Sequence, residues 1–65
     1  MYIGNERLLR DIETTDGTTD IVISAVTAWQ MMPTGDLQIF LQGDTIFTVH
    51  SNQEAVLAHL RVAVA

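Results

Sequence analysis

The sequence predicts an α+β fold, in which a small antiparallel sheet of three to four strands carries one C-terminal helix packed on one face. Two apolar runs flank Gly43-Asp44, as in a β-hairpin, and an apolar stripe with helical spacing follows the second run. The chain has only 65 residues, so we expect a single domain. We expect β-hairpin or meander strands near residues 7–14, 19–28, 37–42 and 45–50, and a helix near 52–64.

The first expected strand, residues 7–14, has a helical alternative. Glu6 and Arg7 each precede an oppositely charged residue by four positions, the spacing of ion pairs on a helix. In favour of a strand, Leu8-Arg10-Ile12 would alternate with Leu9-Asp11-Glu13 on the two faces of extended backbone, and the hairpin dipeptide Asp16-Gly17 follows. We expect a strand, and a helix over residues 5–14 stays open at this point.

The second strand, residues 19–28, is rich in β-branched side chains, which favour extended backbone. Its apolar run Ile21-Val22-Ile23 is typical of an interior strand rather than an edge. A turn should follow over residues 31–36, because Pro33 lacks a backbone donor and Gly35 permits turn geometry.

The third and fourth strands determine the functional interpretation. A two-residue loop at Gly43-Asp44 would pair Leu41 with Ile46 and Phe40 with Phe47. Apolar patches then lie on both faces of the sheet, because side chains alternate along each strand. One face would carry Leu37, Ile39, Leu41, Ile46, Thr48 and His50, and the other Gln38, Phe40, Gln42, Thr45, Phe47 and Val49.

The C-terminal helix has a start signal and an apolar stripe. Ser51 as N-cap and Glu54 three residues later form the pattern of a capping box. The apolar stripe covers one sheet face, although the sequence leaves open which one. Its members are Val56, Leu57, Leu60, Ala63 and Val64.

The remaining apolar face predicts association with another chain. A domain of this size usually needs support beyond its own core, and the absence of cysteine excludes disulfides. We therefore expect a homodimer with two-fold symmetry.

The charge balance excludes several classes of partner. The net charge is −5, with three arginines and no lysine, which is too little positive charge for nucleic acid or an anionic membrane. The longest uncharged run, residues 21–35, is shorter than the about 20 residues of a transmembrane helix. The N-terminus lacks the apolar stretch of a signal peptide, so we expect a cytoplasmic protein.

The side chains that carry chemistry form no recognisable catalytic or metal motif. His50 and His59 lack the three- or four-residue spacing of metal ligands on a helix. Ser24 and Ser51 lie in no nucleophile-elbow pattern. We expect no enzyme activity, no metal and no cofactor.

The sequence therefore predicts a non-catalytic protein–protein interaction module, a homo-oligomeric regulator, inhibitor or adaptor of an unknown protein partner. Aromatic and methionine side chains are enriched in such interfaces. An alternative is an oligomeric protein that binds a small molecule, an anion or nucleotide, through Arg7 and Arg10. Ion pairs at the surface also explain these two arginines. The expected contact residues are Trp29, Met31, Met32, Phe40, Phe47 and Val49.

Overall fold

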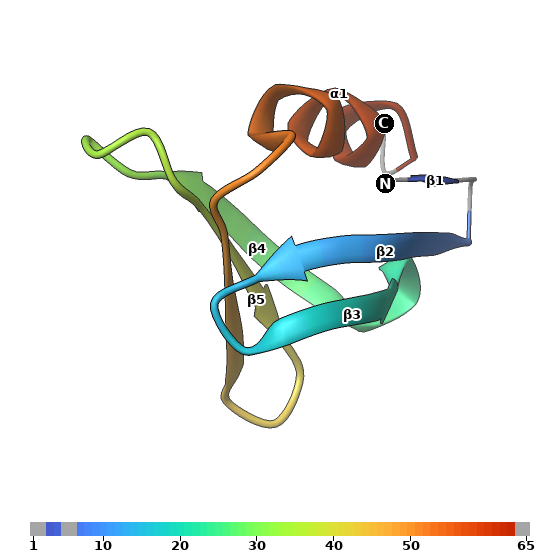
Figure 1. Ribbon diagram of the computed structural model, residues 1–65. Coiled ribbons are helices and arrows are strands. Elements are labelled where there is room, and N and C mark those ends of the chain that lie inside the picture. The colour runs from blue at the N-terminus through green and yellow to red at the C-terminus, as the bar shows by residue number, and fades with distance from the viewer. Residues whose placement is uncertain (1–2, 5–6, 64–65) are drawn as a thin grey trace.

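The computed structural model describes residues 3–4 and 7–63 and shows an α+β fold (Figure 1). The expected class is confirmed, but the described residues form a sheet of six strands rather than three to four. A 3₁₀ turn, η1, interrupts the strands, and the helix α1 follows them. The bounds are β1 Ile3–Gly4, β2 Leu8–Thr14, β3 Gly17–Val22, η1 Ile23–Ala25, β4 Val26–Met31, β5 Leu37–Leu41, β6 Thr45–Val49 and α1 Gln53–Ala63.

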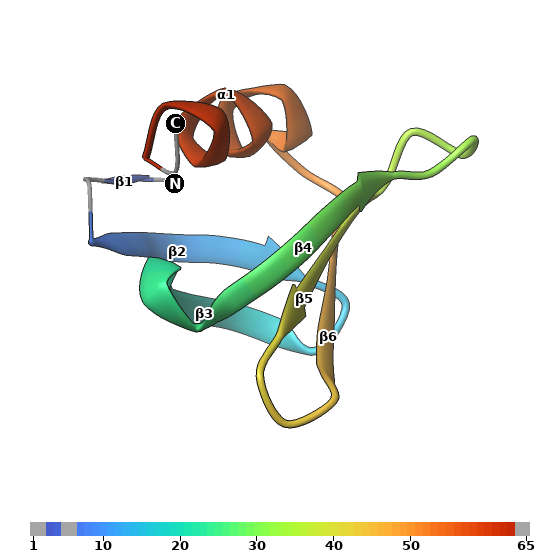
Figure 2. The same ribbon diagram turned by 180° about the vertical axis from the view of Figure 1, so that it is seen from behind.

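The antiparallel sheet consists of a hairpin, a meander that meets it at one point, and the short strand β1, which pairs with β2 of the hairpin. β2 and β3 form the hairpin, and β4, β5 and β6 form the meander. The two parts join where Thr14 pairs with Val49 and the Thr15 amide donates to the Thr48 carbonyl at 3.0 Å. The hairpin runs across the meander, and α1 lies over the concave side between them (Figures 1 and 2).

The first long strand is β2, which confirms the strand expected over residues 8–14. The alternative prediction of a helix is wrong for these residues. Residues 5–6, where that helix would have begun, lie outside the described residues. A β-bulge at Asp11, with φ of 56°, shifts the register against β3 between Leu9 and Ile12. Simple alternation would place Leu9 and Ile12 on opposite faces, yet the bulge directs both into the core. The Asp11 amide donates to Asp20 Oδ1 at 3.0 Å, which ties the bulge to β3.

The expected strand over residues 19–28 is two strands, β3 and β4, separated by η1. Ile23 is buried at this corner, and its amide donates to the Arg7 carbonyl at 3.0 Å. The β-branched run does not reveal the corner, because Val22 and Val26 on either side of η1 are both extended. The chain bends here to pass from the hairpin to the meander.

The pairing of β5 and β6 differs by one residue from the expected register. The turn comprises residues 42–44 rather than Gly43-Asp44 alone, so Leu41 pairs with Thr45 and Phe40 with Ile46. The shift rotates β6 relative to the expected arrangement, because adjacent residues point to opposite faces. Phe47 and Val49 therefore join Leu37 and Ile39 on the inner face, and the sheet has one principal apolar face.

The helix begins one residue later than the capping box predicts. Asn52, with φ of 58°, precedes it, and its carbonyl accepts the first helical hydrogen bond from the Val56 amide at 3.0 Å. Asparagine tolerates this left-handed conformation better than most residues. Gln53 Nε2 donates to the Gly35 carbonyl at 3.2 Å, which ties the start of α1 to the β4–β5 turn.

In the described part of the chain, no helix has the length and apolarity needed to cross a membrane.

The core lies between the hairpin, the meander and α1. Val56, Leu57 and Leu60 of the expected helical stripe are buried, Ala63 is half-buried, and Val64 lies outside the described residues. The helix thus covers the face that carries Leu37 and Ile39. The buried apolar residues are Leu9, Ile12, Ile21, Ile23, Leu37, Ile39, Val49, Val56, Leu57 and Leu60.

The observed register predicts unequal losses of stability for two adjacent substitutions. Phe47 packs against the core, whereas Ile46 points outward and is 51% exposed. Phe47→Ala should lower the free energy of unfolding by about 2–4 kcal/mol, while Ile46→Ala should cost less than about 1 kcal/mol. Urea denaturation of both variants measures the difference, and a larger loss for Ile46→Ala would contradict this register.

Candidate functional site

The β4–β6 meander has an outer face, on the side opposite to the core and α1. The pairing places Ala28, Phe40 and Ile46 in one row across the three strands. The adjacent row consists of Gln30, Gln38 and Thr48. Ile46 is half exposed and Phe40 half-buried, so the first row is an apolar strip beside a polar, uncharged one.

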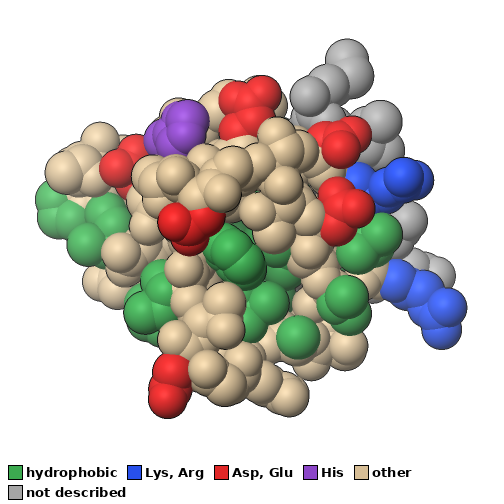
Figure 3. Space-filling view, turned by 60° about the horizontal axis from the view of Figure 1, so that its bottom comes forward, with side chains coloured by type: hydrophobic (Ala, Val, Ile, Leu, Met, Phe, Trp, Pro, Cys, Tyr) green, Lys and Arg blue, Asp and Glu red, His purple; other side chains and the backbone are tan. Residues whose placement is uncertain are grey.

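This outer face lacks charge in a protein whose net charge is −5. Strands β4, β5 and β6 contain no acidic or basic residue. The described acids lie on β2, β3, α1 and the turns. Figure 3 shows hydrophobic side chains exposed in several groups between polar atoms, with the basic side chains gathered at one end.

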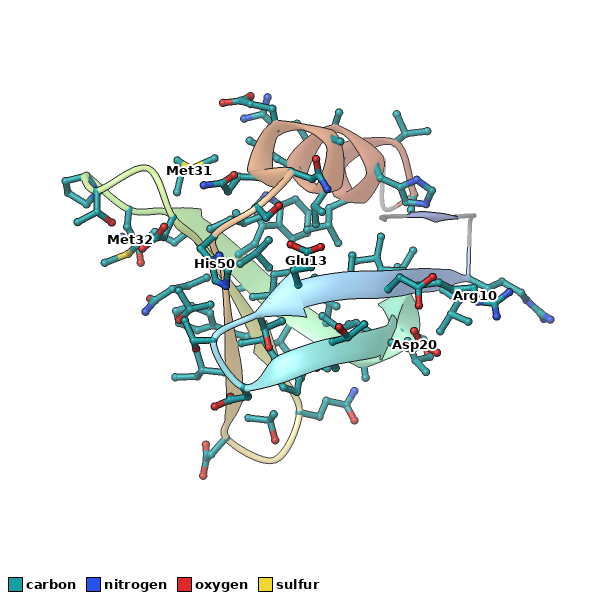
Figure 4. The ribbon with its side chains drawn as sticks, viewed as in Figure 1. Arg10, Glu13, Asp20, Met31, Met32 and His50 are labelled. Atoms are coloured by element: carbon teal, nitrogen blue, oxygen red, sulfur yellow. The ribbon has the colours of Figure 1, made fainter. Side chains whose placement is uncertain are left out.

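The expected contact cluster of Trp29, Met31 and Met32 lies at the end of β4 and in the turn that follows. Trp29 is half-buried and packs against the core, whereas Met31 is 37% exposed. Met31 and Met32 point to opposite sides of the chain (Figure 4). The three side chains are therefore neighbours in sequence but do not form one patch.

The other expected contact residues are divided between the two sheet faces. Phe40 lies on the outer face, while Phe47 and Val49 point inward and Val49 has no exposed surface. Sequence reasoning missed Ile46 and Ala28 as outward neighbours of Phe40. The three-residue turn at 42–44 places Ile46 outward, and the register of β4 against β5 places Ala28 beside Phe40; no local signal in the sequence marks either position.

A cleft of about 770 Å³ lies at the corner between β3 and β4. Arg7 and Ser24 contribute polar groups to its wall, and the last turn of α1 contributes Ala63. Arg10, the second residue of the expected anion clamp, is exposed on β2 and does not line the cleft. The apolar lining residues are Leu8, Val22, Ile23, Val26 and Ala63.

Potential metal ligands stay dispersed over the surface. Within residues 3–4 and 7–63, no three His, Asp or Glu side chains gather closely enough to hold a metal ion. His50 is exposed after β6, and His59 is half-buried on α1. The described surface thus offers an uncharged sheet face and a cleft rather than a cluster of reactive groups.

No family model, curated protein or solved structure matches the chain. The surfaces of the molecule are therefore the basis for a function. Two of them are distinctive: the outer face of the meander and the cleft beside Arg7.

Proposed function

We propose that the protein is a non-catalytic cytoplasmic interaction module that forms homodimers and binds a protein partner as a regulator, inhibitor or adaptor. The observation that carries this proposal is the uncharged outer face of the meander, with Phe40 and Ile46 in its apolar row. Interface centres are depleted in charge and enriched in aromatic side chains. A protein surface can cover this face without removing charges from water.

The size of the apolar row indicates that one copy of this face is a small anchor. Complete burial of a Phe or Ile side chain contributes about 1.5–3 kcal/mol, and part of Phe40 is already covered. Association costs on the order of 4–15 kcal/mol in lost freedom of motion. A stable complex therefore needs additional contacts, which a second copy of the chain would supply.

A charge in the apolar row should abolish binding of the partner. In Ile46→Asp, an exposed position gains a carboxylate, so the fold should persist while the partner would have to bury a charge. Immobilised wild type should retain a protein from the native host's extract that Ile46→Asp retains at least about tenfold less. Quantitative mass spectrometry of the captured proteins measures this ratio.

The matched control for this experiment is Val62→Asp. Val62 is 79% exposed on α1, away from the meander, so this variant gains the same charge outside the proposed face. It should retain the partner as wild type does. Equal capture by all three proteins would contradict binding at the outer face.

The cleft beside Arg7 favours a second candidate function, the binding of a small anion. A guanidinium forms strong charge-assisted hydrogen bonds with carboxylate or phosphate oxygens. The apolar walls of the cleft suit a ligand that also has a hydrocarbon portion. Ser24 on the same wall supplies a hydroxyl group for a further hydrogen bond.

A thermal-shift screen against carboxylates and phosphate compounds tests this second candidate. A ligand at about 100 times its Kd should raise the Tm by on the order of 10 °C in a domain of this size. Arg7→Gln should remove the rise, whereas Arg10→Gln should preserve it because Arg10 does not line the cleft. An equal loss in both variants would indicate a general effect of positive charge rather than a site in the cleft.

A further inference from the structure

Strand β4 forms a free edge of the sheet. It pairs with β5 on one side, and within the described residues no strand pairs with its other side. Figure 2 shows β4 at the margin of the meander. A free edge presents unpaired amide and carbonyl groups, on which another strand can build.

The register identifies which backbone groups face the free side. The Met32 amide donates to the Asp36 carbonyl at 2.7 Å, and the same pairing continues through Gln30–Gln38 and Ala28–Phe40. In an antiparallel pair, hydrogen-bonded positions alternate with positions whose groups point away. The amides and carbonyls of Trp29 and Met31 therefore point to the free side of β4.

This edge lacks the devices that usually prevent edge-to-edge pairing. Natural edge strands carry charges, prolines or bulges. The sequence of β4 contains no charge and no proline, and its bulge is confined to the beginning, between Val26 and Ala28. The opposite edge strand, β3, carries Asp20 and two threonines.

We propose that a second copy of the chain pairs antiparallel with β4, about a two-fold axis that passes at Gln30. Trp29 then lies opposite the partner's Met31, and Met31 opposite the partner's Trp29. Because these residues have the outward-facing amides and carbonyls, the register forms four hydrogen bonds between the strands. This inference rests on the proposed function and specifies how its dimer forms.

Neighbouring registers satisfy fewer of these groups. The two-fold axis can pass at a residue or between two residues. Only an axis at a residue pairs positions whose side chains lie on the same face in both copies, because side chains alternate along a strand. An axis at Met31 would place Trp29 opposite the partner's Pro33, which has no amide. An axis at Trp29 would place Met31 opposite the partner's Thr27, within the bulged segment.

The side chains also favour a second copy as the occupant. Trp29 and the exposed Met31 would cover each other across the axis, a favourable sulfur–aromatic combination. On the outer face, Gln30 would lie beside the partner's Gln30, so no like charges meet although each chain carries −5. A basic partner would gain nothing from this neutral edge. The pairing would join two outer faces into one six-stranded surface.

Disulfide trapping tests the register, because the chain contains no cysteine of its own. In Gln30→Cys, the two thiols would face each other at a position without hydrogen bonds, where Cα atoms are about 4.5 Å apart and a disulfide fits. Gln38→Cys is the matched control on the same face, in a strand paired on both sides. Mild oxidation followed by non-reducing electrophoresis should yield at least tenfold more dimer for Gln30→Cys.

Light scattering of the wild type separates this inference from the proposed function. A wild-type dimer with no more cross-linking of Gln30→Cys than of Gln38→Cys would overturn the β4 register and preserve the homodimer. A wild-type monomer would overturn both. The Met31→Lys variant should be more monomeric than the wild type and should keep the helical circular dichroism signal. The Met31→Leu variant is the control and should remain dimeric. If both variants are dimers, pairing at this edge is contradicted.

Discussion

The turn at residues 42–44 determines how this small protein closes its core. Residues 42–44 form the turn between β5 and β6, and within it Gly43 and Asp44 adopt left-handed conformations, with φ of 80° and 62°. This length places Phe47 and Val49 on the same face as Leu37 and Ile39. With a two-residue turn, the apolar residues of the two strands would have been divided between the faces, and a helix on one side would have left half of them exposed.

The register also changes the physical basis for association. The sequence suggested a second apolar face that needed a cover, whereas the observed outer face has one apolar row among uncharged polar side chains. Self-association is therefore proposed at the edge of β4, whose backbone groups pair with no strand on the free side among residues 3–4 and 7–63. Hydrogen bonds between edges have a defined geometry, and so they specify a register that an apolar patch alone does not.

Two of the expected site residues lie at the surface of the described structure, although their roles stay predictions. Met31 was expected as a contact residue and is exposed, and Arg7 was expected at an anion site and lines a cleft. The separation of Arg7 from Arg10 was not predictable, because it depends on where η1 turns the chain against the start of β2. The outward position of Ile46 depends on the turn length. Both arise from contacts between distant segments rather than from local preference.

The sequence by itself determined the fold class, the approximate places of the three hairpin turns and the apolar stripe of the helix, because these follow from local periodicity and from residues with special backbone preferences. Only the tertiary structure decided which strand faces meet. The bulge at Asp11 brings Leu9 and Ile12 to one face, and the corner at Ile23 divides one apolar run into two strands. The physical reason is that alternation relates residues within a strand, whereas a single inserted residue reverses the relation between strands.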